Sequence, residues 1–353
     1  MIVVGGGLSG LAVAAGAAAR GASVCLIGES RIGEASAAGA GMLAPGAESD
    51  ELHGAAVVRF AVAGRDLFPS YVAGIRERTG IDVPLDRSGI IEIAPNGEPD
   101  SRPLGSEWLD PRALHALEPT LAEGTGALLH PYDGSVDNVV LLQAMRRLVR
   151  SYEAVTIVAG RVRSLDLSSA RPRVMLANGD AMDGGCVVLA GGSWVGQLGG
   201  LPRPIPVRPV RGQMLSLGAA GLRHVTYGGG GYLVPRTGGR TLVGATMEDV
   251  GFDSATTPEG RSALTEVAAR LAPSLASAPL LSHWAGLRPI TPDGLAILGP
   301  DPDVPTLLYA CGHGRNGILL APITGECIGA LAVGEAVSFD LEPFAIGRFA
   351  EAA

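Results

Sequence analysis

The chain of 353 residues is long enough for two domains or one large one, and a hydrophobic content of 47% can fill a sizeable core. The formal net charge is −8, and all 27 basic residues are arginines scattered along the sequence. The chain therefore lacks the basic stripe that is typical of nucleic-acid-binding proteins. Gly, Arg or Asp interrupts every apolar run before the roughly 18 residues that a membrane span needs. We therefore expect a soluble globular protein with no nucleic-acid partner and no membrane span.

The N-terminal residues and the cysteines indicate the compartment and argue against a metal. An apolar segment, residues 2–4, runs straight into a glycine-rich turn, with no basic leader and no cleavage-type segment before it, which predicts a cytoplasmic protein. The cysteines form no C-x-x-C pair and no cluster with histidine at metal-ligand spacing. We expect no metal site, and small buried side chains at Cys25, Cys186, Cys311 and Cys327.

Residues 1–30 have the pattern of a βαβ unit. Residues 1–4 predict a strand, residues 5–10 a tight turn, and the alanine-rich run to about Arg20 a helix, after which residues 22–27 predict a second strand.

The middle of the chain has a different character. Short alternating runs bounded by Pro and Gly, at residues 89–93 and 231–234, predict antiparallel strands, and residues 228–231 predict a turn between strands. Apolar residues recur at helical spacing in three further segments, 139–152, 258–271 and 317–331. We find no repeat of fixed period that would indicate a solenoid or a propeller.

The glycine-rich turn has the spacing Gly5-x-Gly7-x-x-Gly10, between the first expected strand and helix. Backbone N–H groups of such a turn and the helix N-terminus can hold a pyrophosphate. Glu29 follows about 20 residues later, at the end of the next strand, where a carboxylate can accept the hydroxyl groups of a ribose. These features predict a dinucleotide site. They do not by themselves separate FAD from NAD, but the chain carries no second fingerprint for a nicotinamide cofactor.

Several other segments resemble one family of FAD enzymes. Residues 186–192 form a buried strand ending in a small-residue turn, and residues 36–45 form a loop of small residues after the second strand. Residues 284–289 followed by 291–294, and then residues 312–322, are similar to the two closing motifs of that family. On these motifs the chain resembles, nearly from end to end, the FAD-dependent D-amino-acid oxidase family, and within it most closely the glycine oxidases that serve thiamine biosynthesis.

The resemblance implies an α/β fold, in which a Rossmann-like FAD-binding domain is combined with a discontinuous antiparallel-sheet substrate domain. We expect the FAD-binding domain to comprise residues 1–82, 134–205 and 286–353. The substrate domain would then comprise residues 83–133 and 206–285, and its sheet would carry Tyr232 and Met247.

The resemblance also implies non-covalent FAD as the cofactor. In this family a glycine-rich turn, residues 312–317 in this chain, opens a helix whose N-terminus points at the flavin. The partial positive charge of that helix end would stabilise a reduced flavin. Val162 would bind adenine through its backbone groups. The full set of expected cofactor contacts is Gly5, Gly7, Leu8, Ser9, Gly10, Glu29, Ser36, Ala37, Ala38, Gly41, Met42, Val162, Ala190, Gly191, Trp194, Gly312, His313, Gly314, Arg315, Asn316, Gly317 and Ile318.

Four residues match the substrate pocket of the family. Arg288 corresponds to its carboxylate-binding arginine, because a guanidinium pairs with a carboxylate through two parallel hydrogen bonds. Tyr232 matches a tyrosine whose hydroxyl contacts the same carboxylate, and Met247 matches an apolar wall; ordinary packing roles remain open for both. Arg315 matches another pocket arginine, which either contacts the substrate or holds the loop that precedes the last helix.

Three positions depart from the patterns of related enzymes. Residues 228–231 replace a polar residue near the pocket tyrosine, which predicts a more open pocket mouth. Asn138 stands where the family has proline, and we expect it to alter only the entry to a helix. Gly286 stands where sarcosine oxidases attach FAD through a cysteine, so covalent attachment at that position is impossible.

The activity implied is the oxidation of glycine by O₂ and water to glyoxylate, ammonia and hydrogen peroxide, with sarcosine and small D-amino acids as further substrates. The imine intermediate would be available for thiazole synthesis in thiamine biosynthesis. Implied partners are a small amino acid, O₂ or another electron acceptor, thiazole synthase, and further copies of the chain in a homo-oligomer. Two alternatives stay open: a D-amino-acid or N-methylglycine oxidase or dehydrogenase, and a flavin-binding redox partner without turnover.

Overall fold

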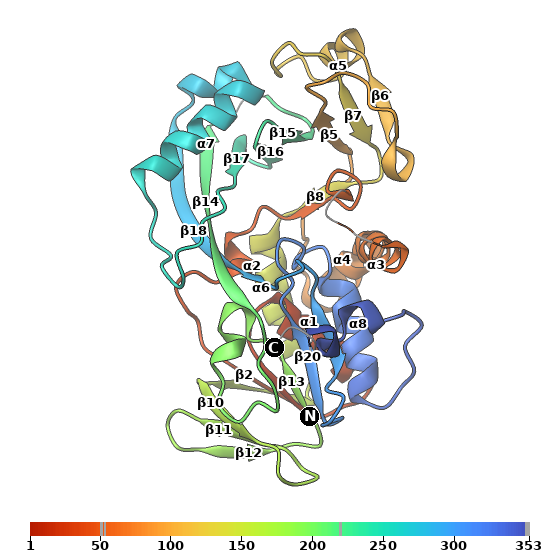
Figure 1. Ribbon diagram of the computed structural model, residues 1–353, viewed down its shortest axis with the longest axis vertical. Helices are drawn as coiled ribbons and strands as arrows, with labels where there is room; N and C mark the ends of the chain where they lie inside the picture. Colours follow the sequence, from red (N-terminus) through yellow and green to blue (C-terminus); the bar gives the residue numbers. More distant parts are fainter. Residues whose placement is uncertain (50–51, 53, 219–220, 350–353) are drawn as a thin grey trace.

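The computed structural model describes residues 1–49, 52, 54–218 and 221–349, and its centre is a six-stranded sheet in the lower half of Figure 1. Its strands are parallel except the edge strand β19, which runs antiparallel to β20. In spatial order they are β19 (Ile297–Pro300), β20 (Leu307–Cys311), β13 (Val187–Leu189), β1 (Ile2–Val4), β2 (Val24–Gly28) and β9 (Val155–Ala159).

Among the described residues, three helices contact the strands of this sheet, α1, α6 and α8, and two further helices pack on α6 and α8. The five helices are α1 (Leu8–Ala19), α3 (Ala55–Asp66), α4 (Phe68–Thr79), α6 (Asn138–Arg150) and α8 (Ala321–Ala332). Helices α1 and α8 approach closely because glycines face each other: a Cβ atom on Gly16 would lie 2.3 Å from the carbonyl oxygen of Gly325. The first βαβ unit is therefore fixed in place by the last helix of the chain.

An eight-stranded sheet occupies the upper half of Figure 1, and its long strands β14 and β18 extend toward the six-stranded sheet. Helix α7 (Pro258–Leu271) packs on β14, β16 and β17. All pairings are antiparallel except the parallel pair β5 and β15. In spatial order the strands are β18 (Leu280–Ile290), β14 (Arg208–Gly218), β17 (Arg240–Gly244), β16 (Gly231–Arg236), β15 (Val225–Gly228), β5 (Ile90–Ile93), β7 (Ala127–His130) and β6 (Glu107–Leu109).

Two three-stranded sheets and several short helices complete the fold. The strands are β10 (Val162–Asp166), β11 (Arg173–Leu176) and β12 (Ala181–Asp183) in one sheet, and β3 (Met42–Leu43), β8 (Gly134–Val136) and β4 (Leu85–Asp86) in the other. The short α-helices are α2 (Ala35–Ala38) and α5 (Pro111–Leu117). Short 3₁₀ helices occupy Pro103–Gly105, Gly192–Gln197, Pro273–Ser277, Glu342–Phe344 and Ile346–Phe349.

The α/β fold with a Rossmann-like sheet and a second, mainly antiparallel sheet is confirmed. The turn expected at residues 228–231 is a hairpin whose central residues, Gly229 and Gly230, have φ angles of 59° and 86°, a conformation that favours glycine. The expected domain boundary at residue 286 falls inside β18, a strand of the eight-stranded sheet that extends toward the six-stranded sheet. The expected range to residue 353 ends in residues 350–353, which lie outside the described residues.

Three expectations need correction. The last helix begins at Ala321 instead of 317, because Pro322 has no N–H group and fits only the first turn of a helix. Met247 lies in the segment after β17 and not within a strand. Cys25 and Cys186 are half-buried at the rims of hydrophobic clusters, whereas Cys311 and Cys327 are buried.

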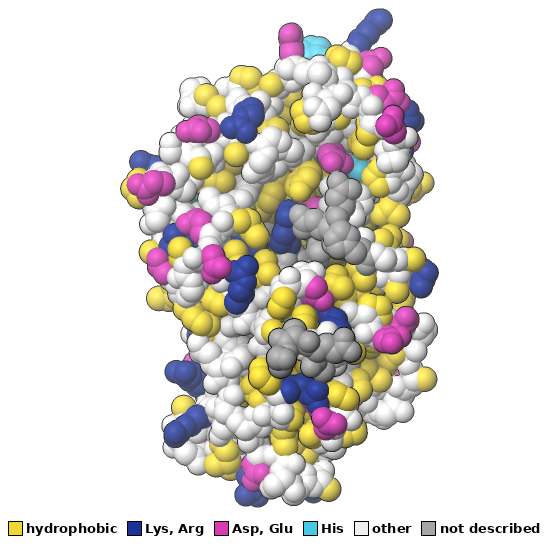
Figure 2. Space-filling view, viewed as in Figure 1, with side chains coloured by type: hydrophobic (Ala, Val, Ile, Leu, Met, Phe, Trp, Pro, Cys, Tyr) yellow, Lys and Arg dark blue, Asp and Glu magenta, His cyan; other side chains and the backbone are white. Residues whose placement is uncertain are grey.

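Within the described ranges, no helix combines the length and the apolar character needed to cross a membrane. The same residues contain no group of three or more His, Cys, Asp or Glu side chains arranged to hold a metal ion. On the face shown in Figure 2, arginine side chains are interspersed with Asp and Glu.

Candidate cofactor and substrate site

A cavity of about 880 Å³ is lined by residues of both large sheets, and its volume lies within the usual range for ligand pockets. One end is formed by the β1–α1 turn, the end of β2 and the start of β10. The other end is formed by β14, β16 and β18. The cavity therefore connects a dinucleotide-type turn with the eight-stranded sheet.

The β1–α1 turn presses against the end of β13. Gly5 has a φ angle of 125°, and a Cβ atom on it would lie 2.2 Å from the carbonyl oxygen of Ala190. A Cβ atom on Gly10 would lie 1.9 Å from the carbonyl oxygen of Gly5. The N-cap of α1 is Gly7, which has no side chain to cap the helix, so the first turn presents backbone N–H groups beyond that of Leu8, and the positive end of the helix dipole, to the cavity.

The segment at residues 35–41, which comprises α2 and the residues after it, lines the cavity and is held by contacts from three elements. Ser36 Oγ accepts a hydrogen bond of 3.0 Å from the N–H of Leu8. Asn138 is buried and donates from Nδ2 to the carbonyl oxygens of residues 36 and 37 at 3.1 and 3.2 Å. Trp284 Nε1 donates to the carbonyl of Ala38 at 3.0 Å. Our expectation that Asn138 alters only a helix entry is therefore wrong.

A buried histidine joins the turn before α8 to the β1–α1 turn. Nδ1 of His313 lies 3.4 Å from Ser9 Oγ, and its Nε2 lies 3.1 Å from Thr324 Oγ1. Burial lowers the pKa of His313 to about 4. The imidazole is therefore neutral at physiological pH, and it fixes two glycine-rich segments that both line the cavity.

At the β2 end of the cavity, Glu29 does not stand alone. Its Oε1 accepts a hydrogen bond of 2.9 Å from Nε of Arg31. The Arg31 guanidinium in turn lies 5.1 Å from the ring centroid of Trp194, which stacks on Phe252 at 5.9 Å. Both nitrogens of Arg31 contact Oε1, so the Glu29 carboxylate can accept ribose hydroxyls beside the Arg31 guanidinium.

The opposite end of the cavity contains Arg288 and Tyr232. Arg288 extends from β18, and its Nη1 donates to the carbonyl of Thr246 at 3.0 Å. The hydroxyl of Tyr232 donates to Sδ of Met214 at 3.4 Å. Burial raises the pKa of the Tyr232 hydroxyl, a shift that the positive charge of Arg288 opposes. A neutral phenol and a guanidinium therefore lie together beside an apolar thioether.

Arg315 and Met247 also line this end of the cavity. Nη2 of Arg315 donates to Oε1 of Glu48 at 2.7 Å, and the Glu48 side chain is only 10% exposed. Met247 is 56% exposed and lies at the mouth, where Gly230 and Gly231 also line the cavity. These glycines present no side chain that would narrow the entrance.

All four residues expected at the substrate pocket line this one cavity, as do most of the expected cofactor contacts. Those cofactor contacts are Gly5, Gly7, Leu8, Ser9, Glu29, Ser36, Ala38, Gly41, Met42, Val162, Ala190, Gly191, Trp194, Gly312, His313, Gly314, Arg315, Gly317 and Ile318. Three expected contacts, Gly10, Ala37 and Asn316, do not line it. Gly10 instead provides the close approach between α1 and the preceding turn.

Sequence reasoning missed several cavity residues, including Glu48, Arg31 and Gly212. Glu48 follows the small-residue loop by a few positions, a signal that could have been used. Gly212 has no such signal: a Cβ atom on it would lie 2.0 Å from Nη1 of Arg288, a contact that only the paired strands β14 and β18 reveal.

The residues at the first end of the cavity fit a flavin dinucleotide. A turn in which Gly5 and Gly10 leave no room for a Cβ atom, beside a helix N-terminus whose N-cap is glycine, suits a pyrophosphate. Gly286 lies at the wall, and a Cβ atom on it would stand 2.4 Å from that of Ala38, so the wall has no room for a larger side chain.

Comparison with known proteins agrees with this arrangement. Residues 1–331 match the family model described as FAD dependent oxidoreductase. The chain is 34% identical to a glycine oxidase of Geobacillus kaustophilus, over 98% of this chain and 96% of that protein. It is also 34% identical to the bifunctional protein ThiO/ThiG of Synechocystis sp., over 99% of this chain and 54% of that protein, so it spans about half the length of that relative. The crystal structure of the Geobacillus kaustophilus glycine oxidase superposes with a TM-score of 0.90 at 32% identity, covering 98% of both chains.

Proposed function

This chain belongs to the family of FAD-dependent oxidoreductases, and we propose that it catalyses the oxidative deamination of glycine with FAD bound non-covalently. The reaction consumes glycine, O₂ and water and yields glyoxylate, ammonia and hydrogen peroxide. The observation that carries the proposal is that the dinucleotide-type turn and the pair of Arg288 and Tyr232 open into one cavity. Sarcosine and small D-amino acids are the further substrates that this cavity would accept.

When bound, FAD supplies the chemistry by accepting a hydride from the substrate α-carbon. The chain itself binds and orients the amino acid. Arg288 presents a planar fork to the substrate carboxylate, and the neutral hydroxyl of Tyr232 adds a donor for the same group. A ligand held at two points has its α-hydrogen in a defined direction, which contributes to rate through orientation.

For Arg315 we propose the role of holding its loop. Its guanidinium pairs with Glu48 across the cavity, which connects the turn before α8 to the segment after the small-residue loop. The pair leaves the net positive charge at the substrate end with Arg288, where a single carboxylate would bind. Met247 would form an apolar wall at the mouth.

We further propose that the imine formed by oxidation of glycine passes to thiazole synthase in thiamine biosynthesis. Relatives named bifunctional protein ThiO/ThiG carry two activities on one chain, and this chain matches about half of that length. Such a fusion supports a functional link between the oxidation carried out here and the activity of the second half.

The test is the reduction of the bound flavin by single amino acids without oxygen. Glycine and sarcosine should bleach the flavin absorbance faster than D-phenylalanine, because Met247 would form a wall that leaves little room for a bulky substrate side chain. Repeating the assay under air and with an artificial acceptor separates an oxidase from a dehydrogenase. Faster reduction by D-phenylalanine than by glycine would refute the assignment, and no reduction by any amino acid would favour a flavin-binding partner without turnover.

A further inference from the structure

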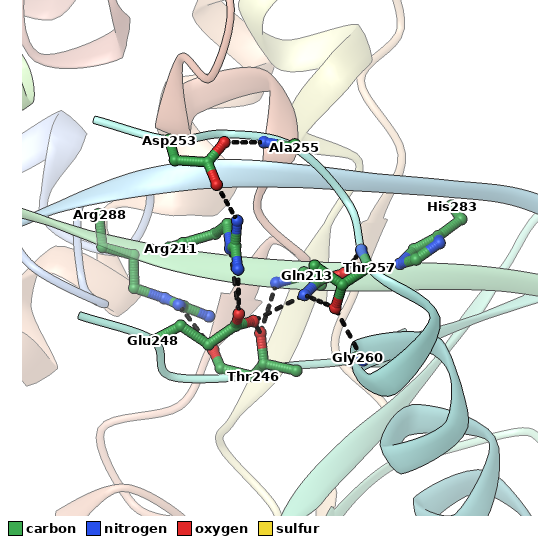
Figure 3. Close-up of polar contacts among 10 residues, drawn as sticks. All are labelled: Arg211, Gln213, Thr246, Glu248, Asp253, Ala255, Thr257, Gly260, His283 and Arg288. Carbon is green, nitrogen blue, oxygen red and sulfur yellow. Dashed lines mark hydrogen bonds and ion pairs between the residues drawn. The ribbon is translucent and has the colours of Figure 1, made fainter. Parts of the chain in front are cut away.

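A polar cluster lies behind the wall that carries Arg288 (Figure 3). Successive side chains of a strand point to opposite faces, so Gly212 and Met214 of β14 line the cavity while Arg211 and Gln213 point away from it. The cluster consists of Arg211, Gln213, Thr246, Glu248, Asp253 and Thr257, and we call it the Glu248 cluster.

Glu248 is the centre of this cluster. Its Oε2 accepts hydrogen bonds from Nη2 and Nε of Arg211, the latter at 3.1 Å. Its Oε1 accepts from Nε2 of Gln213 at 2.8 Å and from Oγ1 of Thr246. The Arg211 side chain is only 5% exposed and also pairs with Asp253 at 2.7 Å. Charge-assisted hydrogen bonds of a largely buried pair hold both groups in one geometry.

The cluster fixes the backbone that contacts Arg288. Glu248 and Arg211 exchange backbone hydrogen bonds of 2.9 and 3.0 Å, and Thr246 Oγ1 accepts from the N–H of Gln213 at 2.8 Å. The segment 246–248 is thereby attached to β14. The carbonyl of Thr246, in this segment, accepts the hydrogen bond from Nη1 of Arg288.

Gln213 connects the cluster to a rigid element. Its Oε1 accepts from the N–H of Thr257, the N-cap of α7, at 2.8 Å, and lies 3.0 Å from Nε2 of His283. The position of the Thr246 carbonyl is therefore set by β14, β18 and α7 together, and not by the loop alone.

We propose that Glu248 is a positioning residue that sets the direction in which Arg288 presents its guanidinium to the substrate carboxylate. This inference rests on the proposed function, in which Arg288 binds that carboxylate. Gly212 limits the guanidinium on the cavity side, and Thr246 limits it from the segment that Glu248 holds. Without the carboxylate of Glu248, the segment keeps its backbone contacts but loses the ion pair that aligns it.

A double-mutant cycle on the FAD-loaded enzyme tests the proposal. The measured quantity is the rate constant of flavin reduction divided by the dissociation constant of glycine, without oxygen. Glu248→Gln should lower it by about 10- to 100-fold, the loss expected when a reacting pair is misplaced by about 1 Å. In an Arg288→Ala background the same substitution should have less than about a twofold effect, because Glu248 acts through Arg288.

Asp249→Asn is the matched control. It removes the neighbouring carboxylate, which forms an exposed ion pair with Arg208. The substitution should leave the measured quantity unchanged. Should Glu248→Gln fail to fold, Gln213→Met decides the question, since it removes one hydrogen bond to Glu248, together with those to Thr257 and His283, and keeps the Arg211 pair. Its loss should be smaller and should also vanish without Arg288.

An equal loss from Glu248→Gln, or from Gln213→Met, with and without Arg288 would show a general structural effect and overturn the proposal. No loss from Glu248→Gln in the presence of Arg288 would overturn it as well, provided that Arg288→Ala alone impairs reduction. If Arg288→Ala alone retains the wild-type value, the proposed role of Arg288 fails first, and this inference fails with it.

Discussion

The guanidinium of Arg288 lies directly against the backbone of Gly212, on the neighbouring strand. A Cβ atom on Gly212 would stand 2.0 Å from Nη1 of Arg288 and 2.5 Å from its Cζ. In the ladder between β14 and β18, Arg288 pairs with Val210 and Gly212 pairs with Gly286, so the side chain extends diagonally over the glycine. The absence of a side chain at residue 212 is what allows this rotamer.

Gly212→Ala should therefore displace the guanidinium without disturbing the strand, because Gly212 does not have a positive φ angle. We expect kcat/KM for glycine to fall by about 100-fold, the loss associated with misplacing a reacting group by about 1 Å. The bound FAD, measured by absorbance, should be unchanged. Gly185→Ala is the control, since a Cβ atom there would meet no atom within 4 Å. Equal kinetics of the two variants would contradict this explanation.

The βαβ unit could be predicted from sequence because its signals are local. Gly5, Gly7 and Gly10 have a fixed spacing, and the strand and helix around them follow directly. The predicted start of the last helix, at residue 317, was wrong because turn residues with helical spacing precede Pro322. Periodicity alone does not separate such residues from a helix.

The supports of the site could not be predicted in the same way. Glu248 meets Arg211 across 37 residues of sequence, and Asn138 reaches the carbonyl of Ser36 across 102. Neither partner is indicated by a motif or a period. Such contacts depend on which strands become neighbours, and that is decided by the whole fold.

His313 gives a prediction about stability and pH. Burial lowers its pKa to about 4, from the usual 6.5 of a histidine. Between these pH values the unfolded chain binds one proton more at this residue than the folded chain, so stability is fully present above pH 6.5 and falls as the pH is lowered. The slope is about 1.4 kcal/mol per pH unit, and the total is on the order of 3 kcal/mol.

His313→Gln should remove this part of the acid destabilisation, because an amide can still reach Ser9 or Thr324 but does not titrate. The measurement is the urea midpoint of unfolding at saturating FAD, at several pH values from 7 to 4.5. Carboxyl groups titrate in both proteins, so the difference between the two pH profiles is the relevant quantity. Parallel profiles would mean that folding does not lower the pKa of His313.

Arg288 provides the prediction on which the proposed function depends most. Removing one partner of a buried, hydrogen-bonded charge pair costs about 2 to 5 kcal/mol, or roughly 30-fold to several-thousand-fold in affinity. Arg288→Ala should lose at least the lower factor in kcat/KM for glycine while it keeps its FAD. Arg288→Lys should recover only part of the loss, since an ammonium keeps the charge but cannot form two parallel hydrogen bonds to a carboxylate. Its Nζ also cannot reproduce both the bond to the Thr246 carbonyl and a two-point contact with the substrate.

A simple amine without a carboxylate separates this role from a general effect on the flavin site. If the wild-type enzyme oxidises such an amine, Arg288→Ala should change the rate of that oxidation little, because the amine has no carboxylate for Arg288 to bind. An equal loss for glycine and for the amine would place the effect of Arg288 on the cavity as a whole. Wild-type kcat/KM in Arg288→Ala, for glycine and for every other amino acid that reduces the flavin, would remove Arg288 from the substrate site.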